Sequence, residues 1–250
     1  MNKYQHNYAA GRPQMYESES RKEKAVRVVK LLEHHYGKGK LLDLTLLDVG
    51  ASTGIIDNEL ANHFKNVIGI DIDKDAIKFA QKNFGKQNLT FKVDDAMNLS
   101  FKNNSFDVII CAQIYEHVPN DQKLINEMYR VLKPNGVCYF AALNKFWPWE
   151  PHHNLPFLSW LPKNLGNYYV KMLGKASRYH ETLRSYWSLR ELTKKFKVIE
   201  YTSKILKNPK EFGYYNLVKF PLNTIAWFIS PLSKYTAPTF FWLLVKKTKE

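Results

Sequence analysis

Short apolar runs alternate along this chain with segments whose apolar residues recur at helical spacing. The runs cover residues 44–49, 67–71, 90–93, 106–112, 137–143, 196–202 and 239–245. Apolar runs of this length, bounded by turn residues, are typical of buried strands. Helical spacing marks residues 17–36, 55–63, 73–84, 120–132 and 188–195, the last beginning at a serine cap. The alternation predicts an α/β fold whose sheet is mostly parallel.

The turn after the first predicted strand is the clearest candidate binding site. Gly50 and Gly54 flank it, and glycine allows backbone angles and a close ligand approach that a Cβ would prevent. The next strand ends in Asp71, roughly 20 residues beyond the first glycine, where nucleotide-binding α/β folds place the acid that grips the ribose. Ser52 and Ile55 stand where a dinucleotide fingerprint requires glycine, so that cofactor class is excluded. A purely structural strand-to-helix turn is the alternative.

Further motifs follow in a fixed order along the chain. They are Asp94-Asp95-Ala96-Met97, Asn104-Ser105-Phe106-Asp107-Val108-Ile109-Ile110, Glu116-His117-Val118 and Arg130-Val131-Leu132-Lys133-Pro134-Asn135-Gly136. With the turn, they resemble the type 11 family of class I S-adenosylmethionine (AdoMet) methyltransferases across residues 46–142, with Ser52 in place of the middle glycine of motif I. The resemblance implies an AdoMet-dependent methyltransferase with a Rossmann-like, doubly wound seven-stranded sheet. That sheet is mostly parallel, its last strand is antiparallel, and helical and aromatic segments are inserted.

The resemblance also assigns cofactor-binding residues by position. It implies that Asp95 accepts a hydrogen bond from the adenine amino group while the Ala96 or Met97 amide reads a ring nitrogen. A carboxylate there selects adenine over hypoxanthine, because only adenine offers an exocyclic donor. Capping of the following turn is the alternative for Asp94 and Asp95. The other candidates are Asp48, Gly50, Ala51, Ser52, Gly54, Asp71, Ile72 and Gln113.

The segment after the fourth strand, residues 113–119, is expected nearest the transferable methyl group. It lacks the Asn or Asp followed by Pro-Pro-Tyr or Pro-Pro-Phe that is typical of nucleobase N-methylation. A hydroxyl acceptor reacts faster when it loses its proton, so His117 is the first candidate for general base and Glu116 the second. The alternative is that both only organise a helix start. Some relatives hold a divalent metal with Glu-x-x-Glu-His, but Gln113 replaces the first glutamate and is a poorer ligand, so no metal is predicted.

An aromatic and proline-rich insertion, residues 144–187, follows the fifth strand. In this architecture ligands bind beyond the carboxyl ends of the strands, so the insertion is predicted to determine substrate specificity. It offers Glu150, His152, His153, His180 and Glu181 as bases, metal ligands or sugar contacts, and we take His152 and His153 as further catalytic candidates. Its aromatic residues could equally fill a small core of their own.

The chain is interpreted as one domain with four parts. Residues 1–43 form an N-terminal arm and helix, 44–143 the AdoMet-binding core, 144–187 the first insertion and 188–250 the remaining sheet with a second insertion at 203–239. We expect the arm either to fold over the cofactor, with Arg12 or a tyrosine on the substrate, or to be a disordered tail. The second insertion mixes aromatic residues with lysines, which suits a helix on a membrane surface, a lid over an apolar substrate tail, or packing on the domain.

Composition affects the expected partners and location. The chain has 37 basic and 23 acidic residues and a net charge of +14, which favours anionic partners, although its lysines are scattered. Cys111 and Cys138 fall inside predicted strands and indicate core thiols in a reducing compartment. No secretory signal and no run of about 20 apolar residues is found. A cytoplasmic protein, peripheral on the inner membrane face if it contacts lipid, is expected.

These observations favour AdoMet-dependent O-methylation of a small or lipid-linked acceptor, such as a glycan or a polyprenyl phenol. Methylation of RNA or protein is an alternative that the positive charge supports, with nucleic acid the weaker expectation. A third reading, a non-catalytic AdoMet-fold subunit that binds a partner, is left open by Ser52 in the turn. The sequence leaves the oligomeric state open.

Overall fold

A seven-stranded sheet forms the centre of the computed structural model, which describes residues 4, 12–215 and 230–247. The strand order is β3-β2-β1-β4-β5-β9-β8. The strands are β1 (Thr45–Val49), β2 (Asn66–Asp71), β3 (Leu89–Val93), β4 (Phe106–Ala112), β5 (Leu132–Leu143), β8 (Phe196–Glu200) and β9 (Thr239–Lys246). The first five run parallel, and β9 is antiparallel to both β5 and β8. The predicted fold class, including the antiparallel last strand, is confirmed.

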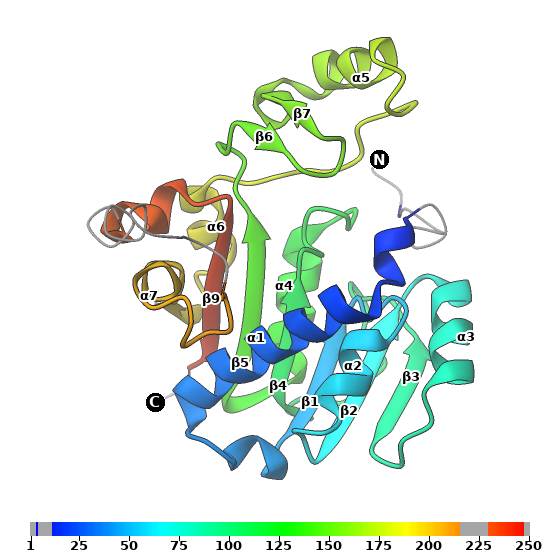
Figure 1. The fold of residues 1–250 in the computed structure, drawn as a ribbon, viewed down its shortest axis with the longest axis vertical. Helices are drawn as coiled ribbons and strands as arrows, with labels where there is room; N and C mark the ends of the chain where they lie inside the picture. The colour runs from blue at the N-terminus through cyan, green and yellow to red at the C-terminus, as the bar shows by residue number, and fades with distance from the viewer. Residues whose placement is uncertain (1–3, 5–11, 216–229, 248–250) are drawn as a thin grey trace.

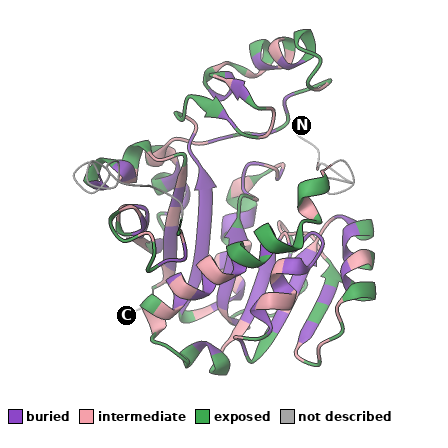
Figure 2. Cartoon of the chain, in the orientation of Figure 1, coloured by how far each residue is buried: buried purple, intermediate pink, exposed green. Residues whose placement is uncertain are grey.

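Helices cover both faces of this sheet (Figure 1). One face carries α1 (Ser18–Tyr36), α2 (Ile55–Leu60), α3 (Lys74–Asn83) and α7 (Thr202–Lys207), and the other carries α4 (Asp121–Val131) and α6 (Tyr186–Leu192). Side chains alternate along each strand, so Leu46 packs under α1 while Leu47 packs under α4. The buried central strands in Figure 2 follow from this, because helices shield both of their faces.

Two predicted starts are wrong by two residues or more, and α2, α6 and β8 (predicted at 55–63, 188–195 and 196–202) end two or three residues earlier than predicted. The helix expected to begin at a Ser188 cap is α6, which begins at Tyr186 because the Ser185 side chain caps it by accepting from the Ser188 amide at 3.3 Å. Strand β5 begins at Leu132 and not at residue 137, since Leu132 pairs with Phe106 across an irregularity before the regular ladder resumes. The two cysteines are free and buried in β4 and β5, as expected of core thiols.

The first insertion is a small unit beyond the carboxyl ends of the parallel strands (Figure 1). It contains β6 (Trp149–Glu150), β7 (Leu155–Pro156), the 3₁₀ turn η3 (Leu158–Trp160) and α5 (Lys163–Met172). Its own apolar cluster is made of Leu143, Leu155, Leu158, Val170, Tyr179 and Leu183. The unit therefore has a core separate from the two clusters that flank the sheet.

The second insertion is only partly described. Phe220, Trp227 and Phe228, on which the interfacial helix or lid was predicted, lie outside the described residues. Tyr214 packs on the domain, with its ring 6.0 Å from that of Phe241 and beneath the Arg27 guanidinium. Within the described residues, no helix combines the length and apolar character needed to cross a bilayer.

Candidate cofactor and methyl-transfer site

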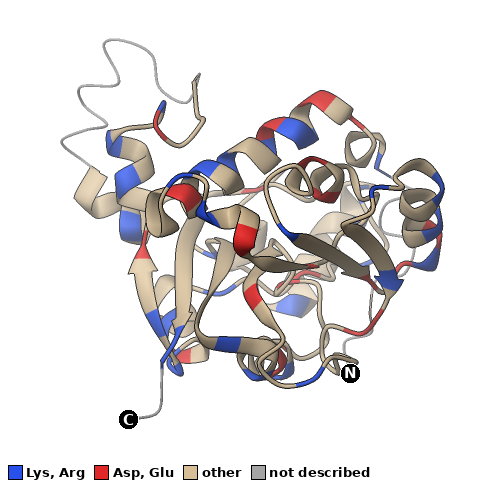
Figure 3. Ribbon diagram, turned by 90° about the horizontal axis from the view of Figure 1, so that it is seen from below, with Lys and Arg blue, Asp and Glu red and all other residues tan. Residues whose placement is uncertain are grey.

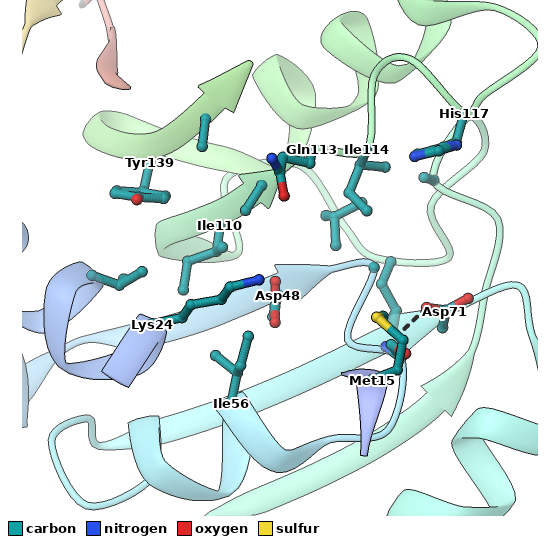
Figure 4. A pocket seen from close by; sticks show the side chains of 18 of the residues that line it. Met15, Lys24, Asp48, Ile56, Asp71, Ile110, Gln113, Ile114, His117 and Tyr139 are labelled. Atoms are coloured by element: carbon teal, nitrogen blue, oxygen red, sulfur yellow. Dashed lines mark hydrogen bonds between the residues drawn. The ribbon is translucent and has the colours of Figure 1, made fainter. Parts of the chain in front are cut away.

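A cavity of about 390 Å³ lies at the carboxyl ends of β1, β2 and β4, beside α1 and the 3₁₀ turn η1 (Pro13–Met15). Its volume lies in the range of small-molecule sites. Figure 4 shows Asp71 and His117 toward one end of the cavity and Lys24 and Tyr139 toward the other. Of the predicted site residues, Asp48, Gly50, Ser52, Asp71, Ile72, Ala96, Gln113, His117 and His152 line it.

The turn after β1 shapes the floor of this cavity. Gly50 and Gly54 have φ values of 91° and 74°, and Ser52 joins them at 52°. A Cβ on Gly50 would lie 2.1 Å from Ile114 Cδ1, so only glycine fits the wall there. In the part of the chain that the structure describes, no group hydrogen-bonds to the buried Ser52 hydroxyl. Serine thus takes the place of the middle glycine at the cost of a left-handed backbone.

Asp71 fixes this turn to the end of β2. Its Oδ2 accepts the Ser52 amide at 2.9 Å, and its Oδ1 accepts the Asp73 amide at 2.9 Å. Burial raises the pKa of Asp71, and these two hydrogen bonds oppose the rise. The carboxylate is therefore held rigidly at the cavity edge, where a ribose would meet it.

Asp95 caps the turn that follows it, which was the alternative role for this residue, while its contact with adenine stays a prediction. Its Oδ1 accepts the Met97 amide at 2.7 Å, which caps the turn, and also accepts the Tyr4 hydroxyl. Ala96 and Tyr4 line the cavity, whereas Asp95 and Met97 lie behind them. The N-terminal arm therefore reaches the predicted adenine end through Tyr4, a contact that no local pattern in the sequence reveals.

A buried acidic pair stands behind the turn. Asp48 lines the cavity, and Asp57 of α2 is fully buried. Burial raises the pKa of Asp48 to about 7, although the positive charge of Arg21 lowers it. Burial and the neighbouring Asp48 raise the pKa of Asp57 as well. The pair consequently retains a proton near neutral pH, because two adjacent carboxylates do not both ionise in a dry site.

Histidines from two distant segments meet at the methyl-transfer end. The rings of His117 and His152 lie 4.8 Å apart, edge to face, and both line the cavity. Glu150 holds His152 through a 2.6 Å contact between its Oε1 and the histidine Nδ1. His153 lies outside the cavity, with its Nε2 3.1 Å from Glu181 Oε2.

The surroundings of His117, His152 and Glu116 shift the pKa values of these side chains in different directions. Burial and the charge of His152 lower the pKa of His117 to about 3, so this imidazole is neutral. Burial also lowers the pKa of His152, but the hydrogen bond and charge of Glu150, with Glu181 and Glu116, raise it overall. Burial raises the pKa of Glu116 to about 7. His152 is thus the stronger base of the two histidines.

The same cluster could coordinate a cation. Glu116, His117 and His152 each offer a ligand atom, and these atoms lie within 4.8 Å of one another. Neither Glu116 carboxylate oxygen has a hydrogen-bond partner among residues 4, 12–215 and 230–247. The sequence predicted no metal because Gln113 replaces a glutamate, but this set does not use Gln113. Metal independence stays a prediction.

Known proteins resemble the central part of the chain. A methyltransferase domain model matches residues 47–140, which span β1 through most of β5. This part of the chain is similar to a methyltransferase domain. The ubiquinone biosynthesis O-methyltransferase of Coxiella burnetii (strain Dugway 5J108-111) is 31% identical over 102 residues, 40% of this chain and 44% of that protein. Its counterpart from Rickettsia typhi is 32% identical over 164 residues, 62% of this chain and 63% of that protein.

Solved structures share the fold of this methyltransferase domain. A SAM-dependent methyltransferase from Methanosarcina mazei has a TM-score of 0.53 at 19% identity, covering 88% of this chain and 98% of its own. The phosphoethanolamine N-methyltransferase 2 of Haemonchus contortus, in complex with S-adenosyl-L-methionine, has a TM-score of 0.52 at 19% identity. The match covers 87% of this chain and 51% of that chain. The chain spans less than half the length of the Coxiella relative that it matches.

Proposed function

We propose that this domain transfers the methyl group of AdoMet to a phenolic hydroxyl of a polyprenyl-type acceptor. The observation that supports the proposal is that His117 and His152 both line the candidate cofactor cavity, with their rings 4.8 Å apart, so that a base would be available to a hydroxyl acceptor bound there. The printed names of the Coxiella and Rickettsia relatives support oxygen as the acceptor atom.

In this proposal His152 is the general base. Its Nδ1 faces Glu150, which leaves Nε2 to accept a proton from the acceptor hydroxyl. His117, with a pKa near 3, is too weakly basic to compete, so it orients the acceptor as a neutral hydrogen-bond partner. Glu116 supports the pair from beneath as a buried acid. The proposal therefore assigns to His152 the general-base role for which the sequence favoured His117.

The residues of the chain account for each change in the reaction. AdoMet would supply the methyl group, which would pass to the acceptor oxygen as the carbon–sulfur bond breaks and the sulfonium becomes a neutral thioether. His152 Nε2 would take the hydroxyl proton. Asp71, Ser52 and Gly50 would hold the cofactor, and orienting the acceptor toward the methyl group would supply most of the acceleration.

The test uses AdoMet with a labelled methyl group and a short-chain prenylated catechol. We expect label on the catechol oxygen in the wild type and a loss of about 100-fold or more in kcat for His152→Ala, the usual contribution of a general base. His180→Ala, at an exposed histidine of the same insertion, is the control and should retain activity. Label that instead enters RNA or protein, or a fully active His152→Ala, would refute the proposal.

A further inference from the structure

The first insertion exposes apolar side chains that a soluble surface does not normally carry. Phe146, Phe157 and Trp160 are 52%, 50% and 46% exposed, and their rings are in contact at 6.5 Å and 4.9 Å. We call these three residues the aromatic cluster. Helix α5 packs beside η3 and exposes Leu165, Tyr168 and Met172, whose spacing puts them on one side of the helix. Contiguous exposed apolar surface of this kind marks an interaction site.

The charge of this unit identifies the partner. The insertion, residues 144–187, contains six basic side chains, Lys145, Lys163, Lys171, Lys175, Arg178 and Arg184. Its two acidic residues, Glu150 and Glu181, are each 1% exposed and contact His152 and His153, respectively, inside the unit. The surface therefore carries positive charge without exposed carboxylates. Elsewhere Lys and Arg alternate with Asp and Glu, as on the helices in Figure 3.

We propose that the first insertion docks on a bilayer surface that contains anionic phospholipid. Exposed tryptophan, phenylalanine and tyrosine beside lysines match the interface between headgroups and acyl chains. The negative potential of such a surface attracts basic residues that lie close to it. Neither a nucleic acid nor a soluble acidic protein explains the exposed apolar residues as well.

Docking would give the cavity access to the lipid phase. The insertion lies beyond the carboxyl ends of the strands, and its own His152 lines the cavity. A bound bilayer would thus lie next to the residues that meet the acceptor. The inference goes beyond the proposed function and does not rest on it, because docking requires only the surface of residues 144–180.

Flotation of the full chain with vesicles tests the inference. We expect binding to vesicles of phosphatidylcholine mixed with phosphatidylglycerol, weaker binding to phosphatidylcholine alone, and release by salt. Phe157→Ser combined with Trp160→Ser should weaken binding by about tenfold or more, since two interfacial aromatic anchors are lost. Trp187→Ser is the matched control, because this tryptophan is 63% exposed on α6, a helix that packs on the central sheet and not in the small core of the insertion.

A second pair of variants isolates the charge. Lys171→Glu with Lys175→Glu should weaken binding to the mixed vesicles, whereas Lys74→Glu with Lys82→Glu on α3 should not. Thermal unfolding establishes that each variant is folded. Equal binding by the Phe157→Ser/Trp160→Ser variant, or self-association through the aromatic cluster without vesicle binding, would overturn the inference. Methyl transfer to a water-soluble catechol is measured separately, so failure of docking is distinguishable from failure of the proposed function.

Discussion

At the residue scale, the pKa of one histidine decides the chemistry. His152 and His117 are both largely buried, and burial lowers the pKa of both. The pKa values of the two histidines differ because Glu150 contacts His152 and not His117. A carboxylate that accepts Nδ1–H fixes the tautomer, orients the ring and raises the basicity of Nε2.

This assignment predicts a pH profile. The base must be neutral to act, so activity should rise as pH increases through the pKa of His152, which lies above 6.5. Glu150→Gln removes the charge that raises this pKa, so the acid limb should move to lower pH while kcat falls about tenfold or more with the weaker, less oriented base. The profile of kcat against pH measures both effects. Glu191→Gln, at an exposed position on α6, is the control.

An acid limb that stays in place in Glu150→Gln, with the control unchanged, would contradict the role of the Glu150 and His152 pair. A merely structural Glu150 would lower the amount of folded enzyme without moving the limb. The direction of the shift is therefore the informative quantity.

At the element scale, the structure divides into a sheet with two covered faces and an insertion with its own core. Leu158 is fully buried in that small core, whereas Leu165 on α5 is 56% exposed. Leu158→Ala should destabilise the insertion by about 2–5 kcal/mol, the usual cost of truncating a buried leucine. Amides of residues 144–183 should then exchange hydrogen faster while those of β1 and β4 keep their protection.

Leu165→Ala is the matched control and should leave exchange unchanged. Loss of protection in β1 and β4 together with the insertion would mean that the two cores unfold as one unit. In that case the separate identity of the insertion would be wrong.

The elements themselves could largely be predicted from the sequence. Apolar runs and helical spacing report which face of a segment is buried, so the order of strands and helices, β9 included, followed from the pattern. Local ambiguity caused the errors: Ser185 and Ser188 are both suitable caps, and only the fold shows which one accepts the amide. The contacts within the site were harder to predict from the sequence. Nothing in the spacing joins His117 to His152, Tyr4 to Asp95, or Asp48 to Asp57.

At the scale of the whole molecule, the parallel strands end at one edge where all parts of the site converge. The turn after β1 and Asp71 after β2 hold the cofactor end, and β4 leads to His117. The first insertion adds His152 from above and presents the surface proposed to meet lipid. The N-terminal arm contributes Tyr4, which donates to Asp95 and also lines the cavity.

The central claim is that this cavity binds AdoMet through the turn and Asp71. Isothermal titration of AdoMet into the wild type and two variants tests it most directly. Asp71→Ala removes the carboxylate and both amide contacts of the turn, so affinity should fall about tenfold or more, since a lost hydrogen bond to a charged group costs roughly 1.5–3 kcal/mol. Asp75→Ala, on the exposed first turn of α3, should bind as the wild type does. The account predicts saturable heat at one site, lost in Asp71→Ala alone; no heat in the wild type, or undiminished affinity in a folded Asp71→Ala, would contradict it.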